Sequence, residues 1–212
     1  MIDINFFFAL VSFYFVMYVT PGPNNTMVLA SGLKFGFSKT VPVIFGITIG
    51  HIIQLVLVCL GLWKLFQIYP QLQFLLKIGC AVYMSYLSFK IIGSFGKFGV
   101  NNTRPIKIYE AALFQIVNPK AWTISSMAAS GFISNEMNLI GSVSIIAFVA
   151  LLVCPLSISP WAGFGSAIRS FVKKHRIRLA IEYLLAALLL ITAALILADT
   201  KISDSLIFTL NS

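Results

Sequence analysis

Two short clusters of helix-breaking residues interrupt apolar stretches of this sequence and place polar groups inside them. The first comprises Thr20, Pro21, Gly22, Pro23, Asn24 and Asn25, and the second comprises Asn118, Pro119 and Lys120. Proline removes a backbone donor and clashes with the preceding turn, so each cluster is expected to break its helix. In a bilayer, broken backbone must face protein or a watery cavity. Paired breaks in two halves of a chain are typical of a transporter's substrate site.

The first cluster combines backbone freedom with amide side chains. Gly22 permits the close approach of other groups, and Asn24 and Asn25 supply hydrogen-bond donors and acceptors at membrane depth. A helix that resumes after Pro23 presents unpaired N–H groups and the positive end of its dipole, which suit a substrate carboxylate. The alternative is a structural kink that the two asparagines cap.

The second cluster places an amine deep in an apolar stretch. At a rise of 1.5 Å per residue, Lys120 lies about 18 Å into its span, too far for its side chain to reach the interface. A charge at that depth costs about 3 kcal/mol on insertion scales, which makes Lys120 a functional candidate. We expect it to pair with a substrate carboxylate, or with Glu110 or Glu182.

Three titratable residues are candidates for proton coupling, with His51 and Glu182 ranked ahead of Glu110. An imidazole titrates closest to neutral pH, and Glu182 stands on an otherwise apolar helix. The alternatives are a hydrogen-bonded structural histidine and solvated carboxylates near the cytoplasmic ends of their spans. Gly46 and Gly50 form a G-x-x-x-G pair, which is more typical of close helix packing than of ligand binding.

These polar groups need a scaffold, and the composition predicts a membrane-embedded one. Of 212 residues, 59% are hydrophobic and 10% are charged, whereas a soluble domain has about 25% charged residues. A transmembrane helix takes about 20 apolar residues. Six stretches are candidates: Ile4–Leu33, Val41–Trp63, Pro70–Ile92, Ile108–Ile133, Asn138–Trp161 and Leu179–Ala198. The first has 30 residues, too many for one straight span, which independently favours a break.

The net charge of +9 follows the positive-inside pattern and does not indicate nucleic-acid binding, because the basic residues lie in short loops. One side of the predicted bundle collects eleven of them: Lys34, Lys39, Lys90, Lys97, Arg104, Lys107, Arg169, Lys173, Lys174, Arg176 and Arg178. The other side collects Lys64, Lys77 and Lys201. This asymmetry predicts a multi-pass protein with both termini outside the cytoplasm. The basic run 173–178 is expected to anchor that topology and to contact anionic lipid.

An odd number of spans in each half turns the second half upside down relative to the first. That arrangement is the inverted-repeat plan of many secondary transporters. We expect residues 1–98 to form the first three-helix repeat, residues 99–107 a cytoplasmic connector, and residues 108–212 the second three-helix repeat. In this all-α integral membrane fold of six helices, the first and fourth helices are the broken ones.

Other functional classes fit these residues less well. A membrane thiol-disulfide electron-transfer protein needs a reactive cysteine near each break, but Cys59, Cys80 and Cys154 lie elsewhere in apolar stretches. A metal-ion exporter would use more intramembrane thiols or carboxylates than this sequence offers. Carboxylate pairs or Ser/His pairs typical of an enzyme do not occur at helical spacing. We therefore expect no catalytic residues, no metal site and no cofactor.

These motifs resemble the lysine-exporter (LysE/RhtB-type) family of bacterial amino-acid exporters over nearly the whole chain. The resemblance is strongest at TPGPNN (20–25) and the glycines that follow it, which are Gly32, Gly36, Gly46 and Gly50. The segments FQIVNPKAW (114–122) and LLKIGCAVYMSYLSFK (75–90) are similar to the family's fourth and third spans. The last span departs from the family, because Glu182, Ala186 and Ala187 stand where small glycines are common.

The resemblance implies export of amino acids or their derivatives across the bacterial inner membrane, driven by the proton gradient. The PGPNN form looks like the branch that includes cysteine and O-acetylserine exporters. The implied partners are a small amino-acid substrate, protons and membrane lipid, with no nucleic acid. Association into a homo-oligomer is left open.

Overall fold

The structure is a computed structural model that describes residues 4–62, 68–92, 104–133, 137–168 and 175–210. Its regular elements are all helical within these ranges. In chain order they are α1 (Ile4–Val19), α2 (Pro23–Phe35), α3 (Phe37–Leu57), the π turn η1 (Val58–Leu62), α5 (Pro70–Ile91), α6 (Ile108–Leu113), the 3₁₀ turn η3 (Phe114–Val117), α7 (Pro119–Phe132), α8 (Leu139–Ile168) and α9 (His175–Leu210).

Both predicted helix breaks are present. The chain leaves α1 at Val19 and starts α2 at Pro23, and the two helix axes differ by 57°. The second break lies at Asn118, between η3 and α7. Pro23 and Pro119 each open the resumed helix, where their fixed φ suits the helix and their missing N–H would have had no helical partner.

The lengths of the helices bear on the number of membrane crossings. Among the described residues, Phe37–Leu62 and Leu139–Ile168 are each long and apolar enough to cross a bilayer, and the bent pair α1 and α2 together makes a third. Three shorter apolar helices are Phe74–Tyr86, Ile108–Val117 and Leu179–Ala194. The structure thus supports a multi-span protein, and the count of six spans stays a prediction.

Several element boundaries differ from those predicted. The fifth apolar stretch continues as α8 to Ile168, past the predicted end at Trp161, although Pro155 and Pro160 lie inside the helix. Neighbouring helices can re-satisfy backbone groups that such prolines leave unpaired. The glycine-rich stretch 93–103, which holds much of the predicted connector, lies outside the described residues, as does the part of the basic run before His175.

Glycines let the helices of the two halves approach closely. A Cβ on Gly50 would lie 2.6 Å from the Cα of Ala112, and one on Gly46 would collide with the Ile108 carbonyl, so α3 packs against α6 through this face. The G-x-x-x-G prediction of close packing is therefore confirmed. Gly32 of α2 meets the carbonyl of Ala162 of α8 in the same way.

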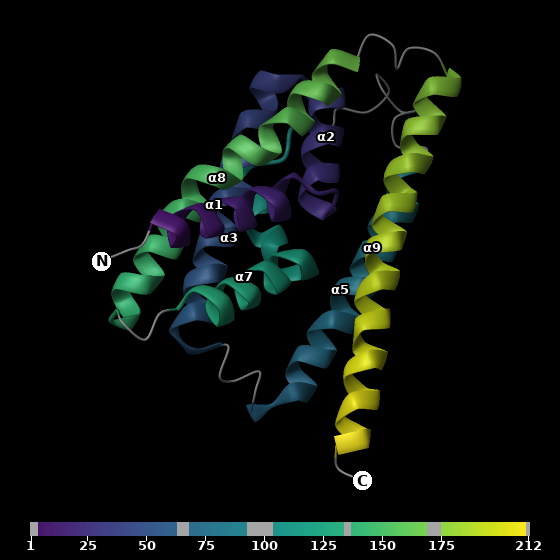
Figure 1. The fold of residues 1–212 in the computed structure, drawn as a ribbon. Coiled ribbons are helices and arrows are strands. Elements are labelled where there is room, and N and C mark those ends of the chain that lie inside the picture. The colour runs from purple at the N-terminus through teal and green to yellow at the C-terminus, as the bar shows by residue number, and fades with distance from the viewer. Residues whose placement is uncertain (1–3, 63–67, 93–103, 134–136, 169–174, 211–212) are drawn as a thin grey trace.

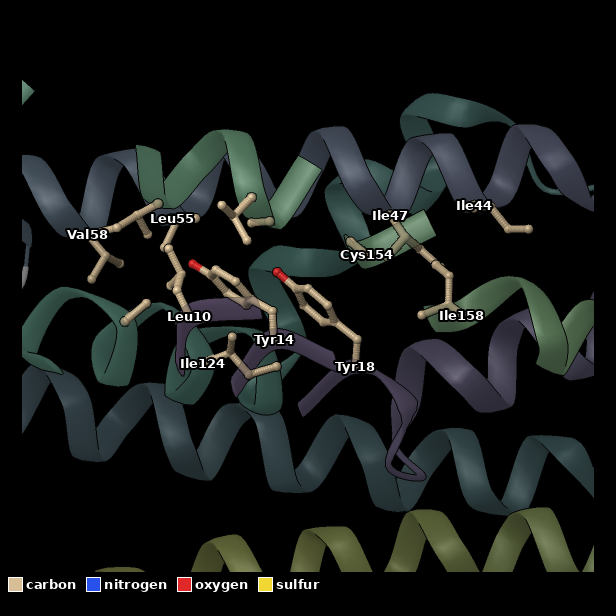
Figure 2. Close-up of a cluster of buried hydrophobic side chains, with 14 of the residues drawn as sticks. Leu10, Tyr14, Tyr18, Ile44, Ile47, Leu55, Val58, Ile124, Cys154 and Ile158 are labelled. Carbon is tan, nitrogen blue, oxygen red and sulfur yellow. The ribbon is translucent and has the colours of Figure 1, made fainter. Parts of the chain in front are cut away.

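Two layers of helices are visible in Figure 1, where α5 and α9 run side by side along one edge of the molecule. The other layer contains the broken helices, with α8 in contact with α1, α2 and α3 and with α3 in contact with α6 and α7. Its core includes Leu10, Tyr14 and Ile124, whose side chains converge in Figure 2. This core surrounds the two helix breaks and holds them together.

Candidate substrate site at the paired helix breaks

The first break is closed by an amide from the helix that follows it. The Nδ2 of Asn25 donates to the carbonyl oxygens of Tyr18, Val19 and Thr20 at 2.9, 3.3 and 2.6 Å. Asn25 is buried, and the indole Nε1 of Trp161 on α8 also reaches the Val19 carbonyl, at 3.2 Å. Carbonyls that lose their helical partners at the break are thus paired with side-chain donors, which a buried break requires.

Lys120 crosses from the second break to the first. Its Nζ donates to the Thr20 carbonyl at 2.7 Å, to the Thr20 Oγ1 at 2.8 Å and to the Pro21 carbonyl at 3.3 Å. Gly22 has φ 178°, extended backbone that any residue adopts, so its role is to leave room. A Cβ there would lie 2.9 Å from the Cδ of Lys120.

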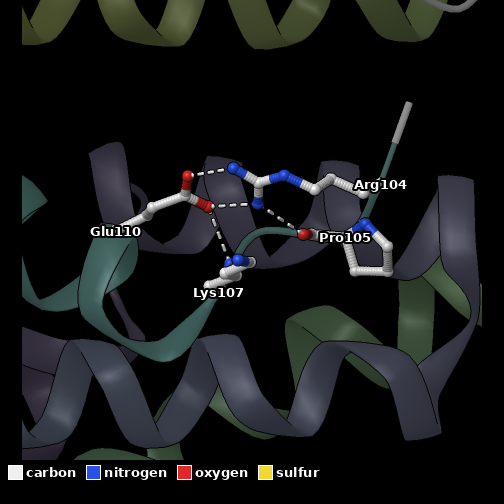
Figure 3. Close-up of polar contacts among 4 residues, drawn as sticks. All are labelled: Arg104, Pro105, Lys107 and Glu110. Atoms are coloured by element: carbon white, nitrogen blue, oxygen red, sulfur yellow. Dashed lines mark hydrogen bonds and ion pairs between the residues drawn. The ribbon is translucent and has the colours of Figure 1, made fainter. Parts of the chain in front are cut away.

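Neither of the two protein carboxylates considered as alternative partners of Lys120, Glu110 and Glu182, accepts a hydrogen bond from its amine. Glu110 lies on the surface at the start of α6, where its carboxylate pairs with Arg104 and accepts the Lys107 N–H at 2.8 Å (Figure 3). Glu182 lies on α9, and the amine of Lys120 has oxygens of the first break as its acceptors. Sequence spacing does not reveal this, because the break itself supplies a ready set of carbonyl acceptors.

A pair of amides joins the two breaks a second time. Asn24 and Gln115 exchange hydrogen bonds in both directions, each 3.0 Å long. Gln115 also accepts from the Nδ2 of Asn118 at 3.3 Å and donates to the Ala111 carbonyl at 3.2 Å. Gln115 is almost fully buried, and the sequence reasoning did not single it out. The signal was a lone amide in an apolar stretch, one turn before Pro119.

The two clusters meet around one cavity of about 20 Å³, enough for a single water-sized group. Its lining comes from five helices, α1, α2, α3, α7 and α8, and from the two breaks. The residues are Met17, Tyr18, Gly22, Asn24, Asn25, His51, Asn118, Lys120, Ala121, Ile124 and Ile158. The structure therefore brings Gly22, Asn24, Asn25, Asn118 and Lys120 to one place. Thr20 and Pro21 border it through Lys120, and Pro23 and Pro119 are buried at the helix starts.

The proton-coupling candidates fall in three different environments. His51 is 1% exposed and lines the cavity, with its ring edge-on to Tyr18 at a centroid distance of 5.4 Å. Glu182 is fully buried on α9, so the expectation of a solvated carboxylate is wrong there. The next turn of α9 packs against two neighbouring helices: Leu185 lies against Leu29 and Leu33 of α2, and the Ala186 carbonyl accepts a hydrogen bond from Ser88 of α5. Glu110 matches that expectation through its surface pairing with Arg104.

Comparison with known proteins now bears on this arrangement. The sequence profile of a family described as LysE type translocator matches residues 15–200. The chain belongs to this translocator family. Its relatives include proteins named cysteine/O-acetylserine efflux protein from Escherichia coli strains K12 and O157:H7. Each is 28% identical over 177 residues, which cover 83% of this chain and 89% of the relative. No solved structure matches the chain significantly.

Membership of a translocator family agrees with the location of the breaks, and the resemblance noted from the sequence is confirmed. The competing classes are not favoured. The residues that line the cavity include no cysteine, and the three cysteines are buried in the helices. Within the described ranges, no group of three or more His, Cys, Asp or Glu side chains is arranged to hold a metal ion.

Proposed function

We propose that this protein exports amino acids or their derivatives across the bacterial inner membrane, as a secondary transporter and not as an enzyme. The observation that carries the proposal is the bridge from Lys120 to Thr20 and Pro21. It places a cation of one broken helix on the open backbone of the other, beside a cavity that both line. Converging half-helices of this kind form substrate sites in transporters.

The substrate carboxylate is the group that Lys120 would bind. In the structure the ammonium is held by neutral carbonyl and hydroxyl oxygens, and a carboxylate accepts stronger, charge-assisted hydrogen bonds. A bound carboxylate would replace the oxygens of Thr20 and Pro21 and loosen the first break. Because the cavity has room for one small group, entry of a whole amino acid requires such an opening.

The names of the relatives favour a small neutral amino acid. Proteins named cysteine/O-acetylserine efflux protein share 28% identity with this chain over most of their length. The cavity supports the same class, because its walls carry the amine of Lys120 together with amides, an imidazole and apolar side chains. L-Cysteine and O-acetyl-L-serine are therefore the first substrates to test.

An inverted repeat of two three-helix units accounts for the contacts between the halves. The second helix of the first half, α3, touches both segments α6 and α7 of the broken helix in the second half. The second helix of the second half, α8, touches both segments α1 and α2 of the other broken helix. This reciprocity is the pattern that a pseudo-two-fold axis in the membrane plane would produce.

Both termini are proposed to lie in the periplasm, on the warrant of eleven basic residues against three on the two sides of the predicted bundle. A reporter that is active only in the cytoplasm, fused to the C-terminus, should stay inactive. Activity of that fusion would overturn either the six-span arrangement or its direction.

We propose that the proton gradient drives export, through antiport of substrate and protons. His51 is the leading candidate for the proton carrier, because it is the imidazole in the cavity wall. Glu182 is buried on α9, which packs mainly against α5, and is the second candidate. Glu110 is paired with Arg104 at the surface and ranks third. Replacing His51 or Glu182 with glutamine should weaken accumulation under an imposed pH gradient. Unchanged accumulation in both variants would exclude these two carriers.

The function is tested by uptake into inside-out vesicles, with a panel of radiolabelled amino acids that includes L-cysteine and O-acetyl-L-serine. Lys120→Met keeps the side-chain length and removes the charge, so uptake should fall by about tenfold or more at equal membrane abundance. Lys39→Met removes an exposed charge at the start of α3 and should leave uptake unchanged. Equal uptake by the parent and the Lys120 variant would reduce Lys120 to a structural residue.

A further inference from the structure

Part of the cavity wall consists of buried polar atoms that have no hydrogen-bond partner. His51 on α3 and Asn118 at the second break each have only 1% of their surface exposed and line the same cavity. The Oδ1 of Asn118 lacks a partner, and the imidazole of His51 has at most one, the side chain of Gln54 one turn further along α3, so at least one ring nitrogen is free. An unpaired buried polar group is costly, so two such atoms around one small space point to a polar group that binds there.

The chemistry of these atoms selects the kind of group. The amide oxygen of Asn118 is an acceptor, and a neutral imidazole offers one acceptor and one donor nitrogen. Among the described residues that line the cavity there is no carboxylate. A cavity of about 20 Å³ holds a group the size of a water molecule, and an ammonium group has that size and carries N–H donors for both acceptors.

Lys120 completes the recognition of an α-amino acid. It lines the cavity together with His51 and Asn118, and its amine suits a carboxylate. An α-amino acid carries a carboxylate and an ammonium on neighbouring atoms, so the two groups can meet Lys120 and the two acceptors at once. A molecule that lacks the amine, or carries it acylated, would leave the acceptors of His51 and Asn118 unpaired.

We propose that His51 and Asn118 accept hydrogen bonds from the α-ammonium group of the substrate, which makes the site selective for free α-amino acids. This inference rests on the proposed export function and adds the specificity-determining residues for one end of the substrate. The two roles proposed for His51 can be tested separately. Recognition of the ammonium group is measured with competing ligands, whereas proton coupling is measured as accumulation under an imposed pH gradient.

A matched control is available on α8. Ser142 is buried there, and its hydroxyl oxygen also lacks a partner, but it does not belong to the cavity lining. Ser142→Ala therefore perturbs a buried polar group without touching the proposed subsite, whereas Gln54 is unsuitable because its side chain interacts with the imidazole of His51. His51→Phe removes the ring nitrogens and keeps an aromatic ring against Tyr18.

The experiment compares three competitors of radiolabelled L-cysteine uptake into inside-out vesicles: unlabelled L-cysteine, 3-mercaptopropionate, which lacks the amine, and cysteamine, which lacks the carboxylate. In the parent protein, 3-mercaptopropionate should inhibit about tenfold more weakly than L-cysteine, as the loss of one charge-assisted hydrogen bond predicts. In His51→Phe this ratio of the two inhibitor strengths should fall toward one, whereas Ser142→Ala should keep the parental ratio. Cysteamine should inhibit more weakly than L-cysteine in the parent and equally so in His51→Phe, because it lacks the carboxylate that Lys120 is proposed to bind.

The outcomes separate the two proposals. If the parent transports neither L-cysteine nor O-acetyl-L-serine nor any other amino acid of the panel, the proposed function fails. If the parent transports L-cysteine but the ratio stays at the parental value in His51→Phe, the inference is overturned and the polar atoms hold only water. If His51→Phe does not reach the membrane, Asn118→Leu is used instead, because it removes the other acceptor. An unchanged ratio in Asn118→Leu would likewise overturn the inference.

Discussion

The two helix breaks differ in what pairs with their open backbone. At the first break, the carbonyls of Val19 and Thr20 receive hydrogen bonds from Trp161 of α8 and Lys120 of α7, in addition to the amide of Asn25. Two of these three donors belong to helices far along the chain. The conformation of the first break therefore depends on where the second half of the protein lies.

The second break is held mainly by its own segment. The Asn118 N–H donates to the Gln115 carbonyl at 3.2 Å, and the indole of Trp122 donates to the Ile116 carbonyl at 2.9 Å. From the first half, Asn24 exchanges hydrogen bonds with Gln115, and oxygens of Thr20 and Pro21 accept from Lys120. A shift of α8 would thus remove the Trp161 bond from the first break while leaving these bonds of the second intact, so the first break is the one suited to respond to substrate.

Of the substitutions that test the difference between the two breaks, Gly22→Ala should have the largest effect on transport. It disturbs the contact of Lys120 with Thr20 and Pro21 without changing a polar group. The extended backbone at Gly22 accepts any residue, but the new Cβ would meet the Lys120 side chain at 2.9 Å and displace its amine. Vesicle uptake should fall by about tenfold at equal membrane abundance, since small misplacements at a site have such costs.

The matched control is Gly79→Ala on α5, where an added Cβ meets nothing within 4 Å. Parental uptake in both alanine variants would mean that Lys120 does not need its present position, and the bridge would lose its role in transport.

Asn25→Ala and Asn118→Ala compare the stability that each break draws from its asparagine. The Asn25 amide pairs three carbonyls, so its loss should destabilise the protein by about 2 kcal/mol. Asn118 makes one side-chain bond of 3.3 Å, and its loss should cost about 0.6 kcal/mol, as is common for bonds in membrane proteins. Thermal unfolding of the purified variants in detergent micelles measures both, and a larger loss for Asn118→Ala would reverse the comparison.

Asn24 and Gln115 provide the smallest expected effect and the most direct measure of coupling between the breaks. A double-mutant cycle with Asn24→Ala and Gln115→Ala should give a coupling energy of about 1 kcal/mol, because each residue both donates and accepts. Strict additivity of the two losses in unfolding experiments would show that the amide pair contributes nothing specific to the joint between the halves.

The positions of the breaks, the membrane class and the family could be predicted from the amino-acid sequence alone. These features follow from short-range physics: a proline acts on its own turn, and apolar composition needs no knowledge of contacts. The G-x-x-x-G pair on α3 belongs to the same group, since a glycine face on an apolar helix permits close packing with whichever helix lies beside it. Its partner, α6, was not evident from spacing.

The pairing of the polar groups, in contrast, depends on how the helices pack against one another. In the folded chain, Lys120 donates to the carbonyls of Thr20 and Pro21, Asn24 pairs with Gln115, and Glu182 on α9 is buried. Each of these outcomes depends on distances between segments far apart in the chain. Hydrogen bonds form only at about 3 Å and in narrow angles, so a pattern of residue types can name the candidates, but the packing of whole helices selects the partners.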